Sequence, residues 1–119
     1  MLLTIPLSIG QASARVWDDP RVITEHALLE IKPGRERDFE AAFAEAKTII
    51  ASMPGFESLE VHRCIERPNC YLLLVDWASL EDHTEGFRKS AEYQDWRRLL
   101  HHFYEPFPTV EHYSLVARA

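Results

Sequence analysis

Apolar positions along residues 21–55 follow first the spacing of a strand and then that of a helix. Residues 22–31 form a mainly apolar run that ends at Lys32-Pro33-Gly34, where Pro and Gly mark the turn into a helix. From residue 35 to about residue 53, apolar side chains recur at helical intervals on one face, which consists of Phe39, Phe43, Ala46 and Ile50. Pro54-Gly55 ends this predicted helix.

Two further strands are predicted over residues 56–66 and 70–77. The first alternates Leu59, Val61 and Ile65 with polar residues, which is typical of a half-buried strand. The second is a continuous apolar run, which favours a central strand covered on both faces. Residues 66–69 form the turn between them. A loop of two or three residues there would place Cys64 and Cys70 out of register, so we expect reduced thiols in a cytoplasmic protein.

The last part of the chain predicts a broken helix and a closing strand. Ser79 precedes an acidic residue at the spacing of a helix start, and Ser90 is placed to cap a second segment over residues 91–103. Apolar residues of that segment share a face, namely Tyr93, Trp96, Leu100 and Phe103. After a proline-rich connector, residues 109–118 form the last predicted strand, with Val110, Ser114 and Val116 on one face and Tyr113 and Leu115 on the other.

The order of elements predicts an α+β fold, the ferredoxin-like βαββαβ unit with an antiparallel sheet. Residues 21–119 form this domain, and residues 1–20 form an N-terminal arm and linker. Alternating apolar residues in the arm favour an edge strand docked on a sheet; the alternative is a tail ordered only by a crystal. Because the helices can cover one face of the sheet only, we expect a homodimer that pairs two sheets face to face.

Composition limits the partners of this chain. Its 119 residues, 46% of them apolar, suffice for one core. A formal net charge of −6, with basic and acidic residues interspersed, argues against nucleic acid. No apolar run approaches the ~18 residues that span a bilayer. We therefore expect a soluble, cytoplasmic protein that binds a small molecule and no membrane.

Residues 76–104 concentrate the side chains from which a catalytic site could be built. A histidine near its ordinary pKa could accept a phenolic proton at neutral pH, which makes His83 a candidate base, although a surface or structural histidine is the more frequent finding. Arg88 could stabilise a phenolate or a superoxide-like anion, or it could pair with a neighbouring glutamate. Trp77 ends the central strand and is either a cavity wall or a core residue. These three are the predicted catalytic residues.

A second group is predicted to bind the substrate. Tyr93 and Trp96 could pack a planar ligand or belong to the core. The remaining candidates are His26, Phe43 and His101. His26 and His112 could share a sheet face and bind a metal, but no His, Asp or Glu set shows a recognisable metal spacing. Glycine-rich flavin and nicotinamide motifs are absent, so we expect no metal and no cofactor.

Three segments of the chain resemble the antibiotic biosynthesis monooxygenase-like proteins of the dimeric α+β barrel superfamily. They are Ile31-Lys-Pro-Gly34, Met53-Pro-Gly-Phe56 and Tyr71-Leu-Leu-Leu-Val-Asp-Trp77-Ala-Ser-Leu-Glu-Asp-His83. The segment from Gly86 to Ser90 and the tail from His101 to Tyr113 are similar to one subgroup. The resemblance covers roughly residues 21–117.

This resemblance implies a cavity between the helices and the sheet of each subunit. In the family's oxygenases, an aromatic substrate loses a phenolic proton and supplies electrons to dioxygen, without a cofactor. Trp77 matches the family's Trp, and Arg88 and Tyr93 are counterparts of its Arg and Tyr. The family's Asn has no counterpart, since Asn69, the single Asn of this chain, lies in the hairpin turn. No histidine falls at the position of the iron ligand of the family's haem degraders, so haem is not expected.

The leading functional hypothesis is a cofactor-independent monooxygenase that acts on a hydroxylated aromatic or quinol, with His83 or His26 as the base. Two alternatives stay open besides haem degradation. One is a polyketide cyclase or isomerase, which would use the same cavity and consume no oxygen. The other is a ligand-binding or stress-associated dimer without catalysis, in which apolar enclosure would carry the binding.

Overall fold

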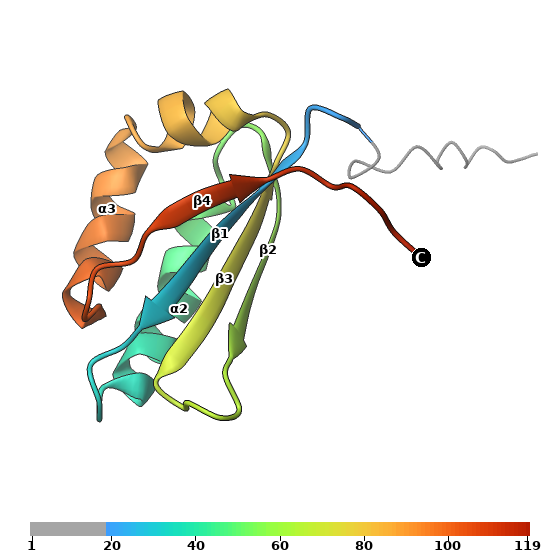
Figure 1. Cartoon of the computed structure of the whole chain (residues 1–119). Helices are drawn as coiled ribbons and strands as arrows, with labels where there is room; N and C mark the ends of the chain where they lie inside the picture. Colours follow the sequence, from blue (N-terminus) through green and yellow to red (C-terminus); the bar gives the residue numbers. More distant parts are fainter. Residues whose placement is uncertain (1–18) are drawn as a thin grey trace, which may run out of the picture.

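The computed structural model describes residues 19–119, and the predicted N-terminal arm therefore lies almost wholly outside the described residues. Four strands form one antiparallel sheet in the order β2-β3-β1-β4. The strands are Ile23–Glu30 (β1), Phe56–Arg63 (β2), Cys70–Trp77 (β3) and Val110–Tyr113 (β4). The helices are Glu36–Ile50 (α2) and Ala91–Leu100 (α3). The predicted ferredoxin-like fold is confirmed, and the sheet is open rather than closed into a barrel (Figure 1).

Both helices lie against the same face of the sheet (Figure 1). Every second residue of β1 and β3 points toward them, because side chains alternate along a strand. The core that results is made of Ala27, Leu29, Tyr71, Leu73, Val75 and Trp77 from the sheet, and of Phe39, Phe43, Ala46, Ile50, Trp96 and Leu100 from the helices. The opposite face of the sheet has no helix over it in the described chain, and its Leu28 is 40% exposed.

Strand pairing brings distant parts of the chain together at the centre of the sheet. β1 pairs with β3 over its whole length, from Ile23 opposite Trp77 to Glu30 opposite Cys70. On its other side β1 pairs with β4, which places Glu25 directly opposite His112. β4 ends at Tyr113 and is thus shorter than predicted, because β1 begins at residue 23 and offers little chain for further pairing.

The broken helix predicted after β3 is present. A π-helical turn, Asp82–Phe87 (η2), starts where the Ser79 hydroxyl accepts a hydrogen bond from the Asp82 N–H at 3.2 Å. Ser90 caps α3 by accepting from the Tyr93 N–H at 3.1 Å, as predicted. A short 3-10 turn, His101–Phe103 (η3), follows α3, after which the backbone becomes extended.

The predicted register of the two cysteines is wrong. The Cys64 N–H donates to the Cys70 carbonyl at 2.8 Å, so the two residues lie opposite each other across a loop of residues 65–69. The loop is longer than the two or three residues assumed from the sequence, which removes the expected offset. Both cysteines are free.

Candidate active site

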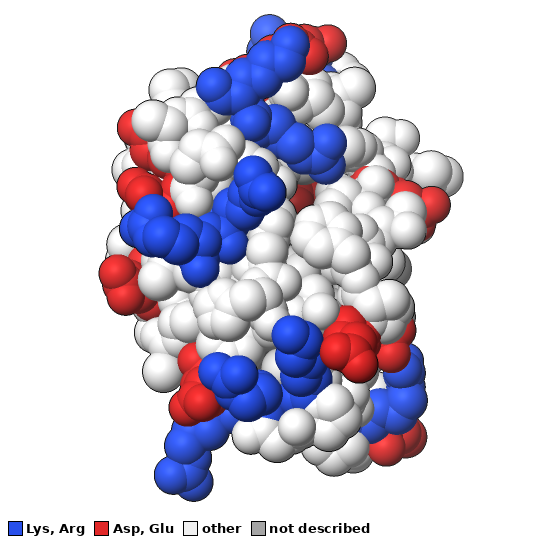
Figure 2. All heavy atoms as spheres, turned by 90° about the vertical axis from the view of Figure 1, so that its left-hand side faces the viewer, with Lys and Arg blue, Asp and Glu red and all other residues white. Residues whose placement is uncertain are grey.

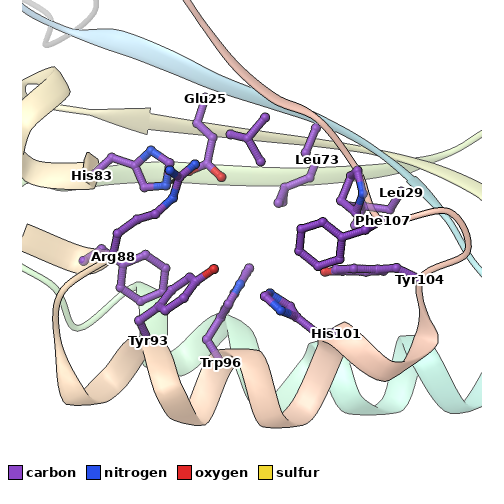
Figure 3. A pocket seen from close by; sticks show the side chains of 14 residues that line it. Glu25, Leu29, Leu73, His83, Arg88, Tyr93, Trp96, His101, Tyr104 and Phe107 are labelled. Atoms are coloured by element: carbon purple, nitrogen blue, oxygen red, sulfur yellow. Dashed lines mark ion pairs between the residues drawn. The ribbon is translucent and has the colours of Figure 1, made fainter. Parts of the chain in front are cut away.

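A cavity of about 360 Å³ lies between the helix-covered face of the sheet and α3 (Figure 3). Its roof comes from β1 and β3, and its floor comes from α3. The residues that follow η3 close one end, and η2 closes the other. One end of the cavity is polar and the other is aromatic, as the labelled side chains in Figure 3 show.

Glu25 is the acidic residue at the polar end. It is 5% exposed and lines the cavity from β1. Its Oε1 accepts a hydrogen bond from the Trp77 indole N–H at 3.0 Å and lies 3.3 Å from Nε2 of His83. Burial raises the pKa of Glu25 to about 6, although the Trp77 hydrogen bond and the charge of Arg88 act in the opposite direction.

His83 connects Glu25 to the last strand of the sheet. The side chain is 2% exposed, and its Nδ1 lies 2.8 Å from Nε2 of His112. Burial, with smaller effects of Arg88 and His112, lowers the pKa of His83 to about 3, so the ring is neutral at neutral pH. When Nδ1 accepts from His112, the proton of the neutral ring lies on Nε2, the nitrogen that faces Glu25. Both ring nitrogens of His83 are then occupied.

Arg88 supplies positive charge beside this cluster. It follows η2 directly, lines the cavity, and reaches toward Glu25 and His83 in Figure 3. Burial is the largest effect on the pKa of Glu25, His83 and His112, and the charge of Arg88 acts to lower the pKa of each of them. Within residues 19–119 the guanidinium has no ion pair with a carboxylate, whereas the neighbouring Lys89 pairs with Glu85 at 2.6 Å. The charge of Arg88 is thus available to a ligand.

Aromatic rings enclose the rest of the cavity. The Tyr93 ring packs edge-on against Phe87 at 5.3 Å and against His101 at 5.9 Å. His101 in turn contacts Phe107 at 4.9 Å, and Phe107 is 61% exposed. Burial lowers the pKa of His101 to about 4 and raises that of Tyr104 strongly. This end of the cavity therefore presents uncharged rings to a ligand.

The surface around α3 is uneven in charge. Figure 2 looks onto this side of the molecule, where uncharged side chains occupy the middle and Lys and Arg side chains lie above, beside and below them. Asp and Glu side chains also lie along the edges of this face, so its border carries charges of both signs.

The structure brings together most of the residues predicted for the site. His83, Arg88, Tyr93, Trp96 and His101 all line the cavity. The roles assigned to them stay predictions.

Three predicted residues lie elsewhere. Trp77 is fully buried one layer behind the cavity, stacked on His83 at 5.4 Å. Phe43 packs against Trp96 at 5.8 Å and lines a separate groove of about 420 Å³ between α2 and the β2-β3 side of the sheet. His26 lies on the uncovered face of the sheet, because the residue after Glu25 on a strand must point the other way.

The expectation that His26 and His112 share a sheet face is wrong. β1 and β4 do lie side by side, but His26 is paired with Glu111, while His112 is paired with Glu25. The two histidines therefore point to opposite faces. In the part of the chain that the structure describes, no group of three or more His, Cys, Asp or Glu residues is arranged to hold a metal ion.

The sequence prediction missed Glu25, Tyr104, Phe107 and the role of His112 as a partner of His83. Glu25 did leave a signal, since it occupies the same strand parity as Ala27 and Leu29, which face the core. A charged residue at an inward position of a strand marks either a buried partner or a site. The other residues gave no such signal, because their positions depend on the fold.

Comparison with known proteins places this chain in a family. The model of the family described as antibiotic biosynthesis monooxygenase (ABM) matches residues 22–99. The uncharacterised protein YczJ of Bacillus subtilis (strain 168) is 54% identical over 93 residues, which cover 78% of this chain and 98% of YczJ.

Solved structures agree in fold. A candidate antibiotic biosynthesis monooxygenase from Bordetella bronchiseptica is 38% identical with a TM-score of 0.77, covering 81% of this chain and 98% of that one. SnoaB from Streptomyces nogalater, described as a cofactor-independent oxygenase, is 20% identical with a TM-score of 0.65, covering 83% and 95%. This chain belongs to the antibiotic biosynthesis monooxygenase family.

Proposed function

We propose that this protein is a cofactor-independent monooxygenase that oxidises a hydroxylated aromatic or quinol-type small molecule with dioxygen. The observation that carries the proposal is the division of the cavity. Aromatic rings enclose one end, while a buried carboxylate, a neutral histidine and an unpaired arginine meet at the other. A planar ring with a hydroxyl group would fit this arrangement with its hydroxyl toward the polar end.

The proposed chemistry starts with transfer of the hydroxyl proton from the substrate to a basic group at the polar end of the cavity. The electron pair stays on the substrate, and the resulting anion transfers an electron to dioxygen. Arg88 is placed to stabilise the negative charge, first on the substrate and then on the reduced oxygen. Tyr93 and Trp96 would hold the substrate ring. Trp77 would act indirectly, through its hydrogen bond to Glu25 and its stacking on His83. The description of SnoaB as a cofactor-independent oxygenase supports a reaction of this type.

Oxygen uptake by the metal-stripped protein tests the proposal. We expect saturable uptake with at least one member of a panel of hydroquinones and dihydroxynaphthalenes, measured against autoxidation without protein. Arg88→Gln should lower kcat/KM at least tenfold, a loss of ~1.4 kcal/mol in transition-state stabilisation. Arg98→Gln is the matched control, because Arg98 lies on the exposed side of α3 and pairs with Asp95.

Uptake no faster than in the protein-free control would reject the oxygenase proposal. Conversion of a substrate without oxygen consumption would favour a cyclase or isomerase. Binding of the same aromatics without any conversion, unaffected by Arg88→Gln, would favour a ligand-binding protein.

We further propose that the uncovered face of the sheet pairs with a second copy of the chain. Leu28 is 40% and Tyr113 is 50% exposed on this face, so apolar side chains are open to solvent there. His26 Nδ1 is buried there and has no hydrogen-bond partner within the described residues. A partner sheet would cover the apolar residues and could satisfy this nitrogen.

The free cysteines further support a reducing compartment such as the cytoplasm.

Sedimentation equilibrium measures the association directly. Wild-type protein should sediment with twice the 13.8 kDa mass of the chain. Leu28→Glu should shift it to the monomer, because a carboxylate would be buried in the paired sheets. Leu80→Glu serves as the control, since Leu80 is similarly exposed, at 39%, but lies outside the sheet. A wild type that stays monomeric at all concentrations would contradict this proposal.

A further inference from the structure

Glu25 and His83 are the two buried polar or charged residues of the described chain, and they lie side by side. Burial of a carboxylate in an apolar core costs free energy unless donors surround it. Perturbed ionisable groups of this kind concentrate in clefts where chemistry occurs. The pair borders the cavity, which makes one of its members the natural proton acceptor for a ligand there.

The contacts of the two side chains decide between them. His83 uses Nε2 toward Glu25 and Nδ1 toward His112, so neither nitrogen is open to a substrate. Oε1 of Glu25 accepts the hydrogen bond of Trp77 and is also the oxygen that lies 3.3 Å from Nε2 of His83. Its Oε2 takes part in neither contact, and the side chain faces the cavity (Figure 3).

The surrounding elements keep this carboxylate in one state and one orientation. Strand pairing sets His112 opposite Glu25, and the π-helical turn places His83 against both. With His112 donating to Nδ1 of His83, the Nε2 proton of His83 must point at Glu25, which favours the ionised carboxylate. A third group that fixes a histidine tautomer in this way is a recurring device of catalytic sites. The other groups that face Glu25 are Arg88 and Tyr104.

We propose that Glu25 is the proton acceptor of this site, and that His83 and His112 are positioning residues that hold its carboxylate ionised and aimed at the substrate. This inference rests on the proposed function for its substrate, a hydroxylated aromatic. In the step itself, the substrate O–H bond breaks and a new O–H bond forms at Oε2 of Glu25. The electron pair remains on the substrate oxygen, beside the positive charge of Arg88.

The first test compares the pH dependence of kcat/KM. With Glu25 as the base, wild-type activity should fall on acidification near its raised pKa of about 6. With His83 as the base, the fall should come near pH 3. Glu25→Gln should lower kcat/KM by about 100-fold, while His102→Gln, a change at an exposed histidine, should leave it unchanged. An acid limb near pH 3, or a Glu25→Gln variant within threefold of wild type, would overturn the proposal.

The positioning role of His112 has its own readout. His112→Leu removes the donor to His83, which lets the His83 tautomer reverse and favours protonated Glu25, so the acid limb should move to higher pH. His112→Gln retains an N–H donor and should restore the wild-type limb. A limb that stays in place in His112→Leu would show that His112 has no part in positioning Glu25.

The final test does not need turnover. 4-Nitrophenol becomes yellow when it ionises, so its spectrum in the presence of the protein reports proton transfer to the site. Wild type should ionise bound 4-nitrophenol at a pH where the free phenol is neutral, and Glu25→Gln should not. If no panel member consumes oxygen but this difference is present, the oxygenase proposal fails and the assignment of Glu25 stands. Equal spectra for the two proteins, or no ionisation by wild type, would overturn the assignment.

Discussion

Replacement of Trp77 by alanine is expected to lower the free energy of unfolding by about 3–5 kcal/mol, the usual cost of deleting a large buried aromatic side chain. The indole is fully buried and packs against Phe56, His83 and Phe87 with ring-centre distances of 6.1, 5.4 and 5.8 Å. Its loss would open a cavity and also remove a donor to the buried Glu25. Urea unfolding followed by circular dichroism measures the change.

A second substitution separates packing from hydrogen bonding. Trp77→Phe retains most of the apolar contacts but removes the indole N–H, which we expect to cost about 1–3 kcal/mol. The same change should raise the pKa of Glu25 further, because the Trp77 hydrogen bond lowers it. Leu80→Ala, at a 39% exposed position, is the control and should change the stability little. A Trp77→Phe variant as stable as wild type would show that the indole N–H contributes nothing to the buried cluster.

Acidification is expected to narrow the stability difference between wild type and His83→Gln by about 3 kcal/mol between pH 7 and pH 4. The folded state lowers the pKa of His83 from 6.5 to about 3, mainly through burial. As the pH falls below about 6.5, His83 therefore takes up a proton in the unfolded chain but stays neutral in the folded chain. This contribution to stability is fully present above pH 6.5 and is lost as the pH falls toward 3. His83→Gln lacks this pH-dependent contribution.

The shifted pKa of Glu25 changes the folding stability with pH in the opposite direction. Its folded pKa is raised from 4.5 to about 6, so its contribution is present below pH 4.5 and is lost as the pH rises through 6. Both proteins carry Glu25, and the glutamine of His83→Gln retains an N–H that can replace that of His83 beside it, so this contribution largely cancels in their difference. Urea unfolding at several pH values gives the measurement, with His102→Gln as the exposed control. A difference that does not change with pH would mean that His83 titrates alike in the folded and unfolded states.

The sequence alone determined the order and nature of the elements. Helical spacing predicted α2, alternation predicted β2, and apolar runs predicted β1 and β3, because burial imposes these patterns on the chain. Local chemistry also sufficed at Ser79 and Ser90, whose hydroxyls cap the following turns within three residues. Five of the candidates line one cavity because they share one short, continuous stretch of chain, namely His83, Arg88, Tyr93, Trp96 and His101.

Tertiary structure decided which residues meet in the cavity. Glu25, His83 and His112 come from three elements far apart in sequence, and only the β1-β4 register and the path of η2 join them. The same register separated His26 from His112, since a shift of one residue along a strand reverses the face. The loop of residues 65–69 likewise aligned two cysteines that its sequence suggested were offset. Spacing along the chain reports local geometry, whereas register and loop length follow from the packing of the whole domain.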